Sequence, residues 1–161
     1  MDWYVRWFVR SSLAWLGVGG LLGLFMTLDP AAFAYRTAHL HALVAGFVTM
    51  MIFGVAYHVM PRFAGRPLHR PSWAALHYWL ANGGLLLLTA GWVVRAHGVG
   101  ASAWLLPAGG FVSGAGALLF IVNIWVTVGA VTAPPRVTRA VRPELVSIGT
   151  PSSAGPKGAS S

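Results

Sequence analysis

The chain has 161 residues, of which 57% are hydrophobic and 9% charged, and its formal net charge is +8 at neutral pH. This composition places it among membrane proteins. Its acidic residues are Asp2, Asp29 and Glu144, none of them inside an apolar run, which argues against a hydrolase or proton relay built on paired carboxylates. The absence of cysteine excludes disulfides, iron–sulfur clusters, thiolate nucleophiles and covalently attached c-type haem.

Four apolar runs are long enough to cross a bilayer, whose hydrocarbon core of roughly 30 Å takes about 20 helical residues. They cover residues 9–27, 38–60, 73–95 and 103–131. Backbone groups in lipid must be satisfied within the protein, and the runs show no strand alternation, so each is expected to be a helix. The sequence therefore predicts an all-α integral membrane four-helix bundle, with residues 1–132 as its single membrane domain.

The basic residues lie between the apolar runs, a placement that favours membrane orientation over nucleic-acid binding. With a cytoplasmic N-terminus, the 11 Lys and Arg residues divide as nine inside and only Arg36 and Arg95 outside. We therefore expect both termini in the cytoplasm of a multi-pass protein of the bacterial inner membrane, in contact with the lipid bilayer and with no nucleic acid. Residues 133–161 are expected to form a disordered cytoplasmic tail, because they are rich in Pro, Ser, Gly and Ala.

The histidines are the candidate functional residues, because an intramembrane imidazole costs free energy unless it is paired or bound. Histidine also commonly holds haem iron. His39 and His41 open the second run and point to opposite sides of a regular helix, so they cannot both bind one iron. The helical stripe that continues from His39 carries glycine, methionine and aromatic residues, whereas that of His41 is aliphatic and suited to lipid. His39 is the preferred metal ligand, and His41 is the second candidate because porphyrin also packs against aliphatic walls.

A haem with two axial histidines needs both at a similar depth in the membrane. His39 or His41 matches His97 near the outer surface, and His58 matches His77 near the inner surface. Each of these pairs is a candidate for cofactor binding. The alternative for each histidine is an interfacial side chain hydrogen-bonded to water or lipid headgroups.

Other polar and small residues suggest supporting roles. Arg36 lies three residues before His39 and is placed either to pair with haem propionates or to extend its charge to the membrane surface. Asn82 and Asn123 are expected to form hydrogen bonds between helices. Glycines in the first and fourth runs are expected to let helices approach closely: Gly17, Gly19, Gly20, Gly23, Gly110 and Gly114.

Within the second run stand Arg36-x-x-His39, then Gly46 and the stretch from Gly54 to Arg62. This run resembles the second helix of the catalytic subunit of haem–copper oxidases. Residues 76–84 and 123–125 resemble parts of that family's next two helices, and the resemblance covers about residues 10–130. It is closest to the nitric-oxide reductase and C-type oxidase branches.

The resemblance implies a low-spin b-type haem, held near the outer surface by the histidine of the second helix, and its Arg-x-x-His register favours His39. The copper and high-spin haem ligands of the family lie on later helices, so neither copper nor a complete oxidase is expected. We expect a small membrane haem b protein, similar to cytochrome c oxidase subunit I, that acts in respiratory electron transport or in haem or gas binding. A second copy or another respiratory membrane subunit is the expected partner.

Two other functions remain open at this point. One is a haem-free accessory or assembly subunit of a respiratory complex. The other is a small transporter or channel with metal- or proton-binding histidines, which the shortage of intramembrane carboxylates and the lack of evident inverted repeats disfavour.

Overall fold

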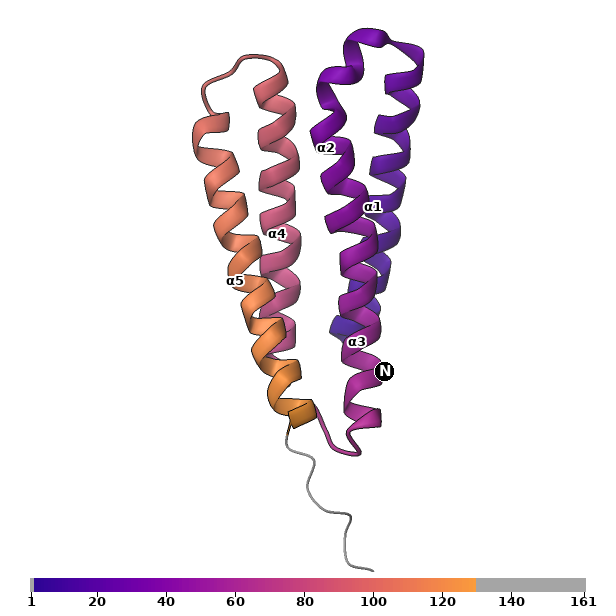
Figure 1. The fold of residues 1–161 in the computed structure, drawn as a ribbon, viewed down its shortest axis with the longest axis vertical. Coiled ribbons are helices and arrows are strands. Elements are labelled where there is room, and N and C mark those ends of the chain that lie inside the picture. The colour runs from indigo at the N-terminus through magenta and orange to yellow at the C-terminus, as the bar shows by residue number, and fades with distance from the viewer. Residues whose placement is uncertain (1, 130–161) are drawn as a thin grey trace, which may run out of the picture. The chain divides into compact units, whose positions relative to one another are not determined.

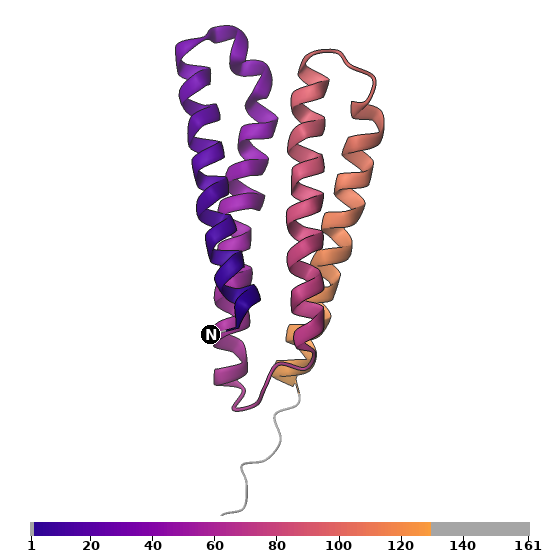
Figure 2. The same ribbon diagram turned by 180° about the vertical axis from the view of Figure 1, so that it is seen from behind.

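The computed structural model describes residues 2–129, which are helical throughout and contain no strand. The elements form four long helical rods. Figures 1 and 2 show that these rods lie side by side and are joined by short turns. The second rod is composite: a short 3-10 turn precedes two α-helical pieces with a π-helical piece between them. The elements are α1 (Trp3–Leu28), η1 (Pro30–Tyr35), α2 (Arg36–His41), η2 (Ala42–Thr49), α3 (Met50–Phe63), α4 (Pro71–Ala96) and α5 (Ser102–Gly129).

Three rods are long and apolar enough to cross a bilayer: Trp3–Leu28, Pro30–Phe63 and Ser102–Gly129. An all-helical membrane protein is thereby confirmed, and the first three rods begin and end beyond the limits expected from the apolar runs. The expected third span forms α4, which is 26 residues long but is not among the three. Its apolar run is interrupted by polar residues such as His77 and Asn82. The expected tail, residues 133–161, lies outside the described residues.

The turns between rods follow from local chemistry. Asp29 ends α1, and its carboxylate accepts a hydrogen bond from the backbone N–H of Ala31 at 2.9 Å, directly after Pro30 has started the 3-10 turn. Gly65 and Gly98 end α3 and α4 with φ angles of 63° and 69°, a left-handed conformation that favours glycine. These turns fold the rods back on one another.

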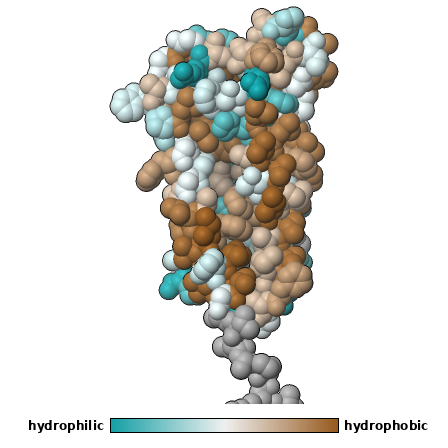
Figure 3. Space-filling view, in the orientation of Figure 1, coloured by the Kyte–Doolittle hydropathy of each residue, from teal (hydrophilic) through white to brown (hydrophobic). Residues whose placement is uncertain are grey.

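The two ends of the rods differ in charge. One end holds the start of α1, the loop 64–70 and the end of α5; we call it the arginine-rich end, after Arg6, Arg62, Arg66 and Arg70. The opposite end holds η1 and the α4–α5 turn. Figure 3 shows apolar residues along the length of the rods, with hydrophilic residues gathered mostly toward the ends. This distribution suits a protein that sits across a bilayer.

The closest helix pair is α4 with α5, and glycine makes the approach possible. A methyl group added at Gly84 would lie 2.6 Å from the backbone nitrogen of Ser113, and one added at Gly109 would lie 2.7 Å from that of Leu88. These backbones can therefore meet only where no Cβ intervenes. On the other side of the molecule, α1 packs on η2 and α3, where Gly46 receives Trp15 and Gly54 receives Phe8.

The expectation for the glycines was only partly right. Gly19 and Gly23 do lie against other parts of the chain, but an added Cβ at Gly17, Gly20, Gly110 or Gly114 would have nothing within 4 Å. In α5 the contact is made by Gly109, one residue from the expected Gly110. A spacing of small residues indicates a close approach but does not tell which face of the helix makes it.

A polar clasp fixes the loop 64–70 to α5. The side-chain amide of Asn123 accepts from the backbone N–H of Arg70 and donates to the backbone carbonyl of the same residue, both at 2.9 Å. Thr127 accepts from the N–H of His69 at 3.0 Å. Asn123 thus holds the backbone at the end of this loop, and Asn82 accepts a helix-to-helix bond from Trp15 at 3.4 Å, as expected.

Adding a methyl group at Gly84 or Gly109 is expected to destabilise the protein by about 1–3 kcal/mol, the usual cost of overpacking. Gly83→Ala and Gly110→Ala are matched controls, because a Cβ at either neighbouring position meets nothing within 4 Å. The comparison is made by reversible unfolding in mixed detergent micelles, followed by circular dichroism. Equal losses at the contact and control positions would show that α4 and α5 do not meet through these glycines.

Candidate functional site

The ring of His39, which belongs to the second rod, is held against α1 by a hydrogen bond to the α1 backbone. Its Nδ1 lies 2.8 Å from the backbone carbonyl oxygen of Gly19. Because a carbonyl oxygen only accepts, Nδ1 carries the proton and the lone pair of the neutral ring is on Nε2. The described residues give Nε2 no hydrogen-bond partner. The second rod thus presents one oriented imidazole nitrogen with a free lone pair.

The ring of His39 rests in a place that α1 leaves open for it. A Cβ added at Gly23 would lie 3.0 Å from Cε1 of His39 and 3.4 Å from its Nδ1. One turn earlier, a Cβ at Gly19 would collide with Leu43. Glycine at these two positions therefore lets the second rod, with the His39 ring, lie close to α1.

His41 points away from this contact, toward α4 and the surface. Its Nδ1 donates to the carbonyl oxygen of Thr37 on its own helix at 2.8 Å, which also leaves the Nε2 lone pair free. Its ring lies 6.0 Å from that of Trp92. It borders a shallow apolar groove of about 360 Å³ with Leu40, Val44 and Ala45. The aliphatic stripe that follows it is largely exposed, as expected for a lipid-facing surface.

His97 and Arg36 lie at the same end of the molecule as His39. The Nε2 of His97 is 2.8 Å from the hydroxyl of Tyr35, and both side chains are near the surface. The guanidinium of Arg36 lies 5.9 Å from the ring of Phe33. The described residues do not bring His97 or Arg36 into contact with His39. Tyr35 was not expected from the sequence to have a role, because an aromatic residue at a span boundary has no distinctive signal.

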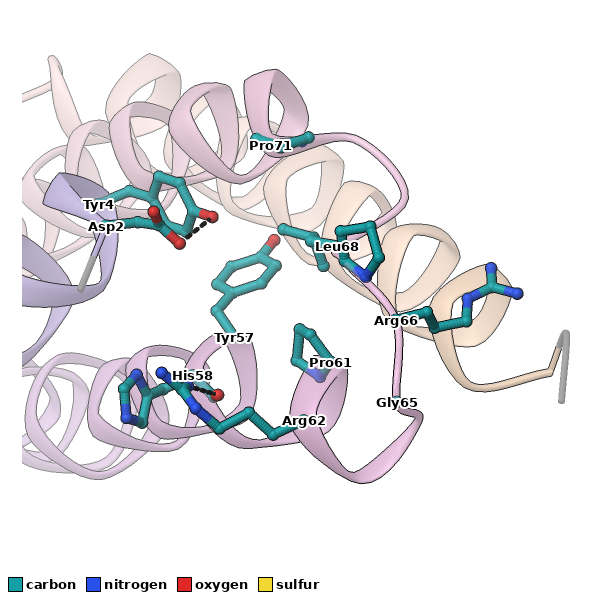
Figure 4. A pocket seen from close by; sticks show the side chains of 11 residues that line it. Asp2, Tyr4, Tyr57, His58, Pro61, Arg62, Gly65, Arg66, Leu68 and Pro71 are labelled. Atoms are coloured by element: carbon teal, nitrogen blue, oxygen red, sulfur yellow. Dashed lines mark hydrogen bonds between the residues drawn. The ribbon is translucent and has the colours of Figure 1, made fainter. Parts of the chain in front are cut away.

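His58 and His77 both lie toward the arginine-rich end, but they do not form a pair. His58 is half-buried at the edge of a hollow near the α3–α4 turn, drawn in Figure 4. Its backbone carbonyl accepts a hydrogen bond from Arg62. The partner of His77 is Tyr57, whose hydroxyl lies 3.1 Å from Nδ1.

His77 is fully buried in a cage of aromatic rings. The ring centroids of Phe53, Phe8 and Phe120 lie 4.5, 5.0 and 5.6 Å from its own. Its Nε2 has no hydrogen-bond partner, and a Cβ added at Gly116 would lie 3.2 Å from its Cδ2. With atoms packed on these sides, the ring has the surroundings of a core residue.

The histidines are thus spread over separate places. Among residues 2–129 no group of three or more His, Cys, Asp or Glu side chains could hold a metal ion together. A haem iron is nevertheless held mainly by its porphyrin, so a single imidazole nitrogen with a free lone pair would suffice as one protein ligand. His39 and His41 both fit that need, and His39 alone is oriented by a second helix.

Comparison with known proteins identifies the relatives of this chain. Residues 4–144 match the family described as cytochrome C and quinol oxidase polypeptide I. The Cbb3-type cytochrome c oxidase subunit CcoN1 of Stutzerimonas stutzeri is 33% identical over 93 residues, covering 53% of this chain and 20% of that protein. The probable cytochrome c oxidase subunit 1-beta of Nocardia farcinica (strain IFM 10152) is 30% identical over 158 residues, covering 79% of this chain and 26% of that protein.

The chain spans about a fifth to a quarter of the length of these curated relatives. No solved structure matches it significantly. The resemblance to the N-terminal part of haem–copper oxidase subunit I is confirmed, and one of the relatives is of the Cbb3 type. The match includes all four rods. The chain is a member of the cytochrome c and quinol oxidase polypeptide I family.

Proposed function

We propose that this chain is a membrane haem b protein in which His39 is an axial ligand of the iron. The observation that carries the proposal is the bond from His39 Nδ1 to the carbonyl of Gly19, which fixes the ring and leaves the lone pair on Nε2. Metal-binding histidines usually donate their second ring nitrogen to a carbonyl or carboxylate in this way. Family membership supports the same choice of cofactor.

His39 is preferred over His41 because of how each ring is held. The hydrogen bond that holds the His39 ring is made to α1, so the ring position depends on tertiary structure and is fixed relative to two rods. The hydrogen bond that holds the His41 ring is made to its own helix, and the ring borders an open groove. A ligand that must keep its geometry through a redox change benefits from the firmer support.

The second axial ligand is the open part of the site. His97 lies at the same end of the molecule, but its Nε2 is engaged by the hydroxyl of Tyr35. We propose that the ligand comes from His97 after release of Tyr35, from a second copy of the chain, or from another respiratory membrane subunit. Bound haem would supply one-electron chemistry or a gas-binding iron, while this chain provides ligation, burial and orientation.

The proposed setting is the bacterial cytoplasmic membrane, with four crossings and both termini inside. Although α4 is less apolar than the other rods, it packs along α5 over a similar length. Several of its polar residues, among them His77, Asn82 and Thr89, are buried or half-buried against other rods. The excess of arginine at the arginine-rich end favours that end as the cytoplasmic one.

Haem binding is tested by the reduced-minus-oxidised absorbance spectrum of the purified protein. The full chain should show the bands of b-type haem, and His39→Ala should lose most of the bound haem, whereas His41→Ala should retain it. His77→Phe is a matched control, because its ring sits in the aromatic cage and its loss should leave the haem content unchanged. A colourless preparation from iron-replete cells would instead support the haem-free accessory subunit, and loss of haem in His41→Ala alone would move the ligand to His41.

The support of His39 by α1 can be tested separately. Gly23→Val should displace the His39 ring and weaken haem binding at least about tenfold, within the range seen when a metal-binding histidine loses the contacts that orient its ring. Gly20→Val is the matched control, because a side chain there meets open space. Haem titration of the apoprotein measures the difference. Equal haem affinities in the two variants would show that the space left by Gly23 does not support the His39 ring.

The four-crossing arrangement predicts opposite sides for the loops before and after α4. Because the chain has no cysteine, Pro67→Cys and Ala101→Cys each provide a single labelling site. In intact spheroplasts a membrane-impermeant maleimide should label Ala101→Cys and leave Pro67→Cys unlabelled, and lysis should expose both. Labelling of both positions from the same side would show that α4 does not cross.

A further inference from the structure

A hollow lies at the arginine-rich end, away from the proposed haem ligand. Its volume is about 650 Å³, and it opens between the start of α1, the end of α3 and the following loop. Figure 4 shows Tyr57 on its floor, with Tyr4 and Asp2 across from Arg62. The walls combine aromatic and proline rings with charged side chains at the rim. Such a mixed lining suits a ligand with both a polar and an apolar part.

Arg62 provides the charged contact at this rim. It donates one hydrogen bond to the carbonyl of His58, one turn back on the same helix, which draws the guanidinium over the end of α3. A guanidinium has five N–H donors, so others remain for a phosphate oxygen. Arg66 has a different task, because it donates to the carbonyl of Val126 at the end of α5.

A separate apolar groove lies along α3. Its volume is about 280 Å³, and it is lined by Met51, Ile52, Val55, Ala56, Val59 and Met60. From Met51 to Met60 the helix rises about 13 Å. That length is close to half of a hydrocarbon core of roughly 30 Å, the depth that one leaflet occupies. The groove therefore has the length of a lipid acyl chain within one leaflet.

One helical row contains residues of both the groove and the hollow. Met51, Val55, His58 and Arg62 follow one another at spacings of four, three and four residues, which places them on one face of α3. Along this face the surface changes from apolar to basic toward the end of the helix. A molecule lying on it would meet aliphatic side chains first and a guanidinium at the end.

The charge around the hollow selects an anion. Of the residues that the structure describes, Arg6, Arg62, Arg66 and Arg70 lie at this end, against the carboxylate of Asp2. That carboxylate accepts a hydrogen bond from the hydroxyl of Tyr4 at 2.9 Å, on the side of the hollow opposite Arg62. We propose that this face binds one anionic phospholipid, with its phosphate at Arg62 and an acyl chain in the groove from Met51 to Met60. Basic pockets at helix ends commonly hold acidic lipid headgroups.

The proposal is tested by native mass spectrometry of the full-length protein released from detergent, with and without added lipid. The protein should retain one phosphatidylglycerol molecule in preference to phosphatidylcholine. Arg62→Gln should lower this retention about fivefold, the effect of one basic residue close to an anionic membrane surface. Arg95→Gln is the matched control, because Arg95 lies over Trp92 near the far end of α4 and is outside the hollow.

A second variant separates the headgroup contact from the acyl-chain contact. Val55→Trp should fill the groove and reduce phosphatidylglycerol retention while Arg62 is intact, and circular dichroism confirms that both variants remain helical. Equal retention of the two lipids, or retention unchanged in both variants, would overturn the proposal. Displacement of the lipid by millimolar inorganic phosphate would overturn it too, because it would identify a simple anion site. The readout is bound lipid, so the result is independent of haem content.

Discussion

The hydrogen bond between the Nδ1 of His39 and the carbonyl of Gly19 ties the candidate site to the fold. This bond forms only if the backbone of α1 comes close enough to the second rod for the His39 side chain to reach a carbonyl of α1. Gly19 and Gly23 provide that approach, since a Cβ at either position would meet Leu43 or the His39 ring. The same two glycines that allow α1 to pack against the second rod therefore also hold the imidazole and fix which nitrogen keeps its lone pair.

Glycines also allow close contacts elsewhere in the fold, and the histidines lie in different surroundings. Gly84 and Gly109 let α4 and α5 meet backbone to backbone, while Gly116 gives His77 its place in the aromatic cage. His77 is a packed core residue with a tyrosine partner, and His97 is a surface residue with another. His39 differs from His77, whose unpartnered Nε2 lies within a packed aromatic cage, and from His41, whose ring is held by its own helix. Burial alone is thus a poor guide to ligation in this protein.

The sequence predicted the helices well, because long apolar runs in a chain with few charges leave no other stable structure in lipid. It did not predict the π-helical turn from Ala42 to Thr49, since π-helix is rare and an apolar run of eight residues carries no distinct signal for it. Nor could spacing show that Gly109 rather than Gly110 faces α4, or that Asn123 serves the backbone of Arg70. These contacts depend on the orientation of each rod about its own axis relative to its neighbours. The residue pattern of a single rod does not give that orientation. The residues that follow each histidine on its helix face favour His39 over His41. The carbonyl of Gly19 that orients the His39 ring belongs to another rod, and this contact is seen only in the structure.

Coordination of haem iron by His39 is tested most directly by pulsed electron paramagnetic resonance of the ferric protein labelled with ¹⁵N-histidine. The spectrum should contain the couplings of axial imidazole nitrogen; those of one imidazole should be lost in His39→Gly and return when free ¹⁵N-imidazole is added. A ferric haem whose nitrogen couplings are the same in His39→Gly as in the unaltered protein would contradict the assignment.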